Sequence, residues 1–332
     1  MRIKNVFVTG GTGKIGRALL PELIKAGYRV RALEFENEFR AIPDCRRGIE
    51  TMPGDLRDPG LAQRALKGMD AVIHLGNCKE NRERFLDTNI KGTFYLLDEC
   101  KNSGHIRQFI QAGSDARAGI FYYPHPFPMD ETHPHQAYPG YYAFSKVLEE
   151  TMCEQYIIQH SLPITTLRFS WVHDEDDILA HLTLKAPNLG VPVWKDLAKT
   201  ARQKEFFRKK RDGVACLVHP GGRPGLRHIV GIKDVIQGIM ISIGNPAALG
   251  QAFAITGPAP FSYKVAADYA AKKLDLPVVE FECGYFHDFT HSIAKARSVL
   301  GYDPQYDITR IIDDALAFRR SGKKRTPLKY IG

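Results

Sequence analysis

The 332-residue sequence predicts an α/β protein with a doubly wound parallel sheet and a smaller C-terminal domain. Short apolar segments alternate with helical patterns in the first half, and a glycine-rich turn follows the first of these segments. Such alternation is typical of a parallel sheet covered by crossover helices. The pattern loosens beyond Trp171. We therefore expect a first domain over residues 1–170 and a second, mainly over 171–318, before a C-terminal tail at 319–332.

The expected strands of the first domain are Asn5–Thr9, Arg29–Glu34, Ala71–Leu75, Gln108–Ala112 and Leu162–Phe169. The expected helices lie at about Lys14–Ala26, Pro59–Leu66, Asn89–Asn102 and Tyr142–His160. Pro21 inside the first helix predicts a local bend, because an interior proline removes a hydrogen bond.

The segment 174–226 is rich in proline, glycine and charge, and we expect it to be an insertion in the second domain. Regular structure is expected to resume at Arg227–Ile232, Asp234–Ile243 and Gln251–Thr256. These segments, within about 227–256, partly return to the first domain. Two further helices fit Tyr263–Leu274 and Ile308–Arg320.

Composition predicts an ordinary globular protein, with 44% apolar and 25% charged residues. No apolar run approaches the ~18 residues of a membrane span, and the first residues run straight into a strand pattern with no room for a signal peptide. The six cysteines are scattered without a CxxC pair, which favours reduced thiols. We therefore expect a cytoplasmic protein without a membrane partner.

The glycine-rich turn carries the first functional signal. Gly10, Gly13 and Gly16 follow a strand and open a helix, with Lys14 and Ile15 between the last two. This spacing provides a tight turn, close backbone approach to a pyrophosphate and free N–H groups at the helix start. Glu34 ends the next strand, where a carboxylate can accept hydrogen bonds from the adenosine ribose and repel a 2′-phosphate. The cofactor is therefore expected to be NAD.

Polar residues and glycines follow the next strands at their carboxyl ends, where open α/β sheets bind ligands. Gly54-Asp55-Leu56 closes the third strand region, and the Asp55 carboxylate is placed to meet the adenine amino group. Leu75, Gly76 and Asn77 end the following strand. His74, just before them, is expected to be structural.

Tyr142 and Lys146 carry the sharpest chemical signal, because residues four apart share one helical face. A neighbouring ammonium and a positive nicotinamide would both favour the phenolate of Tyr142. Tyr142 is then expected to be the general base toward a substrate hydroxyl. Lys146 would also reach the nicotinamide ribose. Ser114, after the strand Gln108–Ala112, is placed to hydrogen-bond the same substrate oxygen.

The chain resembles the short-chain dehydrogenase/reductases, in their extended NAD-dependent epimerase/dehydratase branch. The resemblance covers nearly the whole chain except about 174–226. The residues that carry it are Thr9–Gly16, Gly54-Asp55-Leu56, His74-Leu75-Gly76, Asn89-Ile90-Lys91-Gly92-Thr93, Ser114, Tyr142 with Lys146, Leu167-Arg168, Arg227 through Val235, and Leu300-Gly301-Tyr302-Asp303-Pro304.

The resemblance implies a Rossmann NAD-binding domain, a smaller substrate-binding domain, and hydride transfer between a sugar-like carbinol and the nicotinamide. It implies a cofactor contact at Asn89. It also implies a homodimer through helices near 89–102 and 142–160. The expected substrate-binding residues are Asn77, Ser114, Asp115, Trp171, His173 and Arg227, the last of which matches an arginine that often grips a pyrophosphate.

The chain departs from its family at two informative positions. Dehydratases of this branch carry a glutamate base two residues after the serine or threonine, and this chain has Ala116 there, which disfavours dehydration. Trp171 stands where many nucleotide-sugar enzymes carry an asparagine that contacts the sugar nucleotide. The substrate therefore stays open between a free sugar or polyol and a nucleotide sugar.

An aromatic- and histidine-rich loop at 121–142 is expected to lie over the active site, where aromatic faces suit stacking on a ring. Its three histidines, at 125, 133 and 135, have a proline-rich spacing that preorganises no ligand geometry, so we expect no metal.

The leading hypothesis is an NAD-dependent oxidoreductase acting on a sugar or polyol hydroxyl. The alternative is a UDP-sugar epimerase with tightly bound NAD, which would oxidise and re-reduce the same molecule. A non-catalytic NAD-sensing protein is the hypothesis of another class, and the intact Ser114, Tyr142 and Lys146 set disfavours it.

The net charge of +9 is concentrated in two runs. Residues 195–211 hold eight basic and two acidic residues, and 319–329 hold six basic and none acidic. This distribution disfavours a nucleic-acid partner for the whole protein. The first run contains Phe206 and Phe207, so an amphipathic lid that attracts an anionic substrate is one interpretation and a solvated face is the other.

Overall fold

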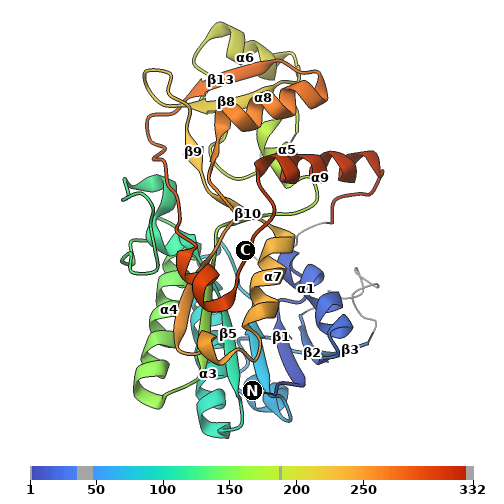
Figure 1. Ribbon diagram of the computed structural model, residues 1–332, viewed down its shortest axis with the longest axis vertical. Helices are drawn as coiled ribbons and strands as arrows, with labels where there is room; N and C mark the ends of the chain where they lie inside the picture. The colour runs from blue at the N-terminus through green and yellow to red at the C-terminus, as the bar shows by residue number, and fades with distance from the viewer. Residues whose placement is uncertain (1, 36–47, 187–188, 327–332) are drawn as a thin grey trace.

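The structure is a computed structural model that describes residues 2–35, 48–186 and 189–326 (Figure 1). Its centre is a seven-stranded sheet in the order β11-β6-β5-β4-β1-β2-β3, with every neighbouring pair parallel. The strands are β1 (Asn5–Thr9), β2 (Arg29–Glu34), β3 (Ile49–Pro53), β4 (Ala71–His74), β5 (Gln108–Ser114), β6 (Ile164–Phe169) and β11 (Gln251–Ile255). The predicted parallel α/β fold is confirmed.

Alternating side chains of β1 fill a core on each face of the sheet. Val6 and Val8 pack with α1 (Lys14–Lys25) and α7 (Ile232–Ser242), whereas Phe7 packs with α2 (Leu61–Leu66) and α3 (Gly92–Ser103) on the opposite face. Burial on both faces explains why the strands are nearly continuous apolar runs. The long helix α4 (Tyr141–His160) lies against α3.

Several element ends differ from the sequence prediction. Strand β5 extends to Ser114, and a π-helical turn η3 (Leu86–Lys91) precedes α3. Helix α1 continues through Pro21, in agreement with the prediction. The segment expected at Arg227–Ile232 is two short strands, β9 (Leu226–Arg227) and β10 (Ile229–Gly231), and β10 pairs with β7 (Trp171–His173).

A second core lies at the far end of the molecule, where β8 (Val214–Val218) pairs in parallel with β13 (Val278–Glu282). Around this pair lie α5 (Asp177–Leu182), α6 (Ala201–Arg208), α8 (Tyr263–Leu274), α9 (Ile308–Arg320) and β12 (Phe261–Ser262). Trp194, Tyr263 and Phe281 are among its fully buried side chains. The remaining short helical turns are η4 (Asp115–Ala118), η5 (Ile120–Tyr122), η6 (Pro246–Ala248) and η7 (Ala296–Leu300).

The basic run 195–211 belongs to this distal core and does not form a lid. Helix α6 begins at a capping box between Thr200 and Gln203, and it packs Phe206 and Phe207 toward the β8–β13 pair. Its two aromatic side chains are therefore explained by packing. Among the described residues, none of 195–211 lines the large cavity presented below.

Two predictions made from the composition can be compared with the fold. Cys78, Cys100, Cys153, Cys216 and Cys283 are buried and free, while Cys45 lies outside the described residues. In the described parts of the chain, no helix has both the length and the apolar character that crossing a bilayer requires.

Candidate active site

A cavity of about 910 Å³ follows the carboxyl edge of the central sheet. It runs from the glycine-rich turn after β1, past the ends of β4 and β5, to Trp171 and Arg227. The parallel strands all end at this edge, so residues far apart in the sequence meet there.

The glycine-rich turn forms one end of the cavity. Gly10 has φ +67°, and a Cβ there would lie 2.7 Å from the Gly76 nitrogen. A Cβ on Gly16 would lie 2.3 Å from the Gly10 oxygen. Both positions therefore require glycine. Gly13 is the N-cap of α1 without a side-chain cap, so the first N–H groups of the helix remain available to a phosphate. This cradle fits the pyrophosphate of a dinucleotide.

Most of the other residues predicted to bind the cofactor line the cavity, but Glu34 does not. Lys14, Ile15, Asp55, Leu56, Leu75 and Gly76 line it. Glu34 is buried at the end of β2, and the cavity is lined by its neighbours Leu33 and Phe35 instead. Burial acts to raise the pKa of Asp55, but the hydrogen bonds and charge of Arg57 outweigh it and hold that pKa below its usual value.

The structure places Asn89 behind the cavity wall. Its side-chain amide accepts from the Cys78 N–H at 2.7 Å, and donates to the Cys78 carbonyl at 2.7 Å and to Ser145 Oγ at 3.0 Å. Asn89 thus joins the segment after β4 to α4. His74 lies between Thr9 and Thr93, and burial lowers its pKa to about 3, so it is neutral and structural.

The three predicted catalytic residues meet at the middle of the cavity. Ser114 ends β5, while Tyr142 and Lys146 lie in the first two turns of α4. Lys146 Nζ is 5.7 Å from the centre of the Tyr142 ring, and it donates to the Ala112 carbonyl at 3.0 Å. The backbone of β5 therefore fixes the lysine that lies beside the tyrosine.

The pKa of Tyr142 corrects one sequence expectation. Burial raises it, and although Lys146 and the hydrogen bond with Ser114 act in the opposite direction, the net pKa is above the usual value. The protein alone thus does not favour the phenolate, because desolvation penalises the charged form. A positive charge at the nicotinamide position would act with Lys146.

Two charged residues after β4 were not singled out from the sequence. Glu80 accepts a hydrogen bond from the Tyr141 N–H at 2.8 Å, so its carboxylate caps the start of α4. Lys79 Nζ lies 5.3 Å from the centre of the Tyr142 ring, and burial lowers the pKa of Lys79 to about 8. Their position just after a strand at the carboxyl edge was the available signal.

Arg227 and Trp171 form the far end of the cavity. Arg227 is 3% exposed, and its Nη1 donates to the Val191 carbonyl at 2.7 Å and to the Tyr263 hydroxyl at 3.2 Å. Asn77 and Asp115 also line the cavity. His173 does not line it, because its ring is buried against Trp171 with a centroid distance of 4.2 Å.

The aromatic loop meets the cavity only in part. Phe121 and Tyr138 line it, with 5.8 Å between the centres of their rings, whereas Tyr122 and Phe127 are exposed on the surface. The predicted cover over the site therefore comes from two aromatic side chains.

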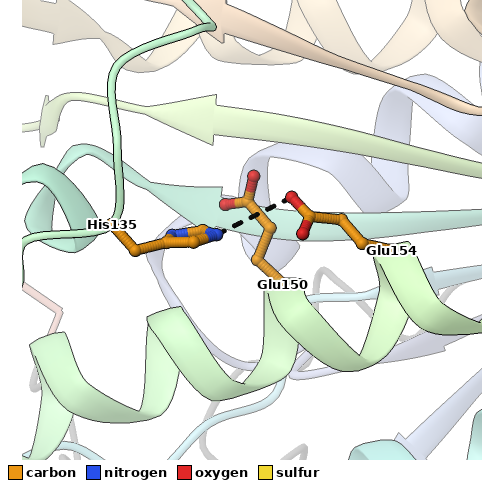
Figure 2. Close-up of side chains that lie close together, drawn as sticks. All are labelled: His135, Glu150 and Glu154. Carbon is orange, nitrogen blue, oxygen red and sulfur yellow. Dashed lines mark ion pairs between the residues drawn. The ribbon is translucent and has the colours of Figure 1, made fainter.

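Behind this loop, Figure 2 shows His135 close to Glu150 and Glu154, both on α4. The possible ligand atoms of the three residues lie within 4.8 Å of one another. Glu150 is already paired with the guanidinium groups of Arg168 and Arg117. Two adjacent cations disfavour a metal ion, so this cluster is an ion-pair network that attaches α4 to β6.

Within the described residues, the basic C-terminal segment contacts the acidic stretch Glu175–Asp177, which is linked to the glycine-rich turn through Lys14. Lys14 pairs with Asp177, which also pairs with Arg325 at 3.1 Å. Asp176 binds Arg319 and Arg325, and the Thr326 N–H donates to Glu175 at 3.1 Å. Thr326 lines the cavity. An acidic segment is thus neutralised from both sides at the predicted phosphate site.

Known proteins resemble this chain in sequence and in fold. UDP-glucose 4-epimerase of Homo sapiens is 32% identical over 169 residues, covering 45% of this chain and 47% of that protein. UDP-glucose 4-epimerase of Rhizobium leguminosarum bv. trifolii is 26% identical over 327 residues, covering 94% and 96%. The chain spans about half the length of the curated relatives that match it first.

A crystal structure of a short-chain dehydrogenase/reductase superfamily protein from Agrobacterium tumefaciens with bound NAD has a TM-score of 0.80 and 24% identity, covering 96% of this chain and 98% of that one. This similarity shows the fold. The sequence pattern of the NAD dependent epimerase/dehydratase family matches residues 6–173, which carry the glycine-rich turn, Ser114, Tyr142 and Lys146. The chain belongs to the NAD dependent epimerase/dehydratase family.

Proposed function

We propose that this protein is an NAD-dependent oxidoreductase that acts on a hydroxyl of a sugar or polyol-like molecule. The observation that carries the proposal is that Ser114, Tyr142 and Lys146 line the same cavity as the glycine-rich turn. A dinucleotide bound at the turn and running along the strand ends would bring its nicotinamide to these residues. When bound, NAD supplies the acceptor for the substrate's hydride.

The side chains of this site then accept the proton, hold the substrate oxygen and supply positive charge. Oxidation of a hydroxyl releases a proton from oxygen, and Tyr142 accepts it as general base. Ser114 Oγ holds the substrate oxygen beside the phenol. Lys146, fixed by the Ala112 carbonyl, keeps a positive charge near Tyr142 and reaches the nicotinamide ribose. Tyr142→Phe should abolish turnover while NAD still binds, and near-normal activity of that variant would contradict the assignment.

Two features of the cavity narrow the reaction type and the class of substrate. Ala116 lines the cavity and cannot accept a proton, which supports oxidation or epimerisation over dehydration. Lys79 and the buried Arg227 place two cations along the cavity, which supports a substrate with an anionic group. A carboxylate of a sugar acid and a phosphate of a nucleotide sugar would both satisfy them.

A UDP-sugar epimerase is the second candidate, favoured by the full-length similarity to UDP-glucose 4-epimerases. One screen separates the two. The protein is incubated with NAD and with sugars, sugar acids or UDP-sugars, and absorbance at the NADH band is followed. A dehydrogenase accumulates NADH with a substrate, whereas an epimerase converts a UDP-sugar with little net absorbance change. No conversion of any of these compounds would contradict both candidates, and NAD binding alone would then support the sensing protein.

We further propose a homodimer through η3, α3 and α4. Leu86, Phe94, Phe144 and Ile158 on these helices are 43–73% exposed. Several exposed apolar side chains on neighbouring helices support a protein interface there.

A further inference from the structure

The catalytic-site lysine has an unusual neighbour. Glu149 lies on α4 three residues after Lys146, and its side chain is 2% exposed. Its Oε2 is 2.8 Å from Lys146 Nζ, and it accepts a second, longer hydrogen bond from Gln111 Nε2 at 3.4 Å. The Lys146 ammonium thus has two acceptors, the Ala112 carbonyl on β5 and the Glu149 carboxylate.

Other titratable groups face this pair from the elements packed around it. They are His74 on β4, Lys79 and Glu80 after β4, Asp115 just after β5, and Tyr142 and Cys153 on α4. His74 is neutral, and Lys79 adds a second cation. Within the described residues, Glu149 is the acid in ion-pair contact with Lys146. Its negative charge is therefore the direct counter-charge of the lysine.

A fully buried ammonium tends to lose its proton, because removal from water penalises the charged form by up to several pKa units. A carboxylate in hydrogen-bond contact reverses that preference. We propose that Glu149 is a positioning residue that keeps Lys146 protonated and aimed at the Tyr142 side of the cavity. This inference rests on the proposed roles of Tyr142 and Lys146.

The electrostatic effect on Lys146 agrees with this geometry, whereas burial raises the pKa of Glu149 above its usual value, against the opposing charge and hydrogen bond of Lys146. Burial is the largest effect on Lys146 and acts to lower its pKa. The charge of Glu149, the charge of Tyr142 and the hydrogen bond with Glu149 together outweigh burial, and the pKa lies above its usual value. Burial also raises the pKa of Tyr142. The charge of Lys146 lowers this pKa by more than the charge of Glu149 raises it. Losing the lysine charge would therefore leave Tyr142 a phenol that ionises less readily.

The test compares Glu149→Gln with wild type by two readouts. The first is the pH profile of kcat/KM for oxidation of the best substrate from the screen, whose alkaline limb reports loss of the Lys146 proton. The second needs no turnover: ε-¹³C-lysine is incorporated, and the Lys146 resonance, identified by its absence in Lys146→Arg, is titrated by NMR. In Glu149→Gln we expect the alkaline limb and the Lys146 pKa to fall by about one unit or more.

Glu150→Gln is the matched control. Glu150 is the next residue on α4, is equally buried, and pairs with arginines, which stay charged without a partner. It should lower the melting temperature without moving the Lys146 resonance. Glu149→Asp, which keeps the charge, should lie closer to wild type than Glu149→Gln does.

The proposal is overturned if Glu149→Gln leaves the Lys146 resonance and the alkaline limb at their wild-type pH. Should Glu149→Gln fail to fold, wild type alone decides: a Lys146 pKa below its ordinary value of about 10.4 overturns the proposal. An active Tyr142→Phe would overturn the proposed function instead, and the NMR titration would still decide the role of Glu149.

Discussion

The guanidinium carbon of Arg227 lies 4.0 Å from the centre of the Trp171 ring. Stacking on the indole and the two hydrogen bonds to Val191 and Tyr263 fix the plane of the arginine at the end of the cavity. A fixed planar fork can bind a carboxylate or phosphate with two parallel hydrogen bonds.

Arg227→Lys should therefore weaken substrate binding, because an ammonium on a flexible stem neither stacks nor forms the fork. We expect the KM for the substrate to rise about tenfold, equivalent to about 1.4 kcal/mol, with the dissociation constant of NAD unchanged. Steady-state kinetics and calorimetric NAD titration measure both. Arg223→Lys is the control, since Arg223 is 60% exposed and pairs with Asp288. An unchanged KM in Arg227→Lys would show that this arginine does not contact substrate.

The acidic segment Glu175–Asp177 predicts a role for the C-terminal residues in cofactor affinity. Arg325 neutralises Asp176 and Asp177 next to Lys14 and the glycine-rich turn. Arg325→Ala should leave excess negative charge beside the pyrophosphate site and raise the dissociation constant of NAD about three- to tenfold at low salt.

Calorimetric NAD titrations at two salt concentrations check this prediction. The difference from wild type should shrink at high salt, because screening weakens the repulsion. Arg320→Ala, at the exposed end of α9, is the control and should bind NAD like wild type. An equal loss of affinity in both variants would point to a general charge effect.

The parts of the site that local chemistry dictates can be predicted from the sequence. Gly10 and Gly16 were recognisable because close backbone approach excludes any side chain, and Tyr142 with Lys146 because one helix carries both. Ser114 was recognisable because it lies at the end of a strand, at the binding edge. These features depend on contacts within short stretches of chain.

The remaining contacts depend on tertiary packing. Glu80 caps α4 from a different loop, and Thr326 reaches the cavity from the other end of the chain. The basic run 195–211 also depends on packing. Its charges left a lid and a solvated face open as interpretations, and Phe206 and Phe207 pack into the distal core. The spacing of residues in the sequence shows neither which distant segments come together in the fold nor against which side chains they pack.

Buried neutral histidines predict a loss of stability below neutral pH. Burial lowers the pKa of His181 to about 3, against about 6.5 in the unfolded chain. The unfolded state therefore binds a proton between these values that the folded state does not, and the free energy of unfolding falls by about 1.4 kcal/mol per pH unit as pH decreases through this range.

Urea unfolding of wild type and His181→Gln between pH 6 and 5 isolates this effect. His181→Gln cannot take up that proton, so its slope of unfolding free energy against pH should be smaller by about 1.4 kcal/mol per unit. The lower stability of the variant at every pH does not alter the comparison of slopes. Equal slopes would show that His181 is protonated in the folded protein.

The proposed dimer gives the last prediction. Phe144 on α4 is 47% exposed, and Phe94 on α3 is 43% exposed, so burial of this surface should drive association. Wild type should sediment at twice the chain mass, and Phe94→Glu combined with Phe144→Glu should sediment as a monomer, because a carboxylate in an apolar interface is strongly destabilising. Val265→Glu, on the exposed side of α8 in the distal core, should remain a dimer. A monomeric wild type at ~10 μM, well above typical dissociation constants of stable dimers, would exclude this interface.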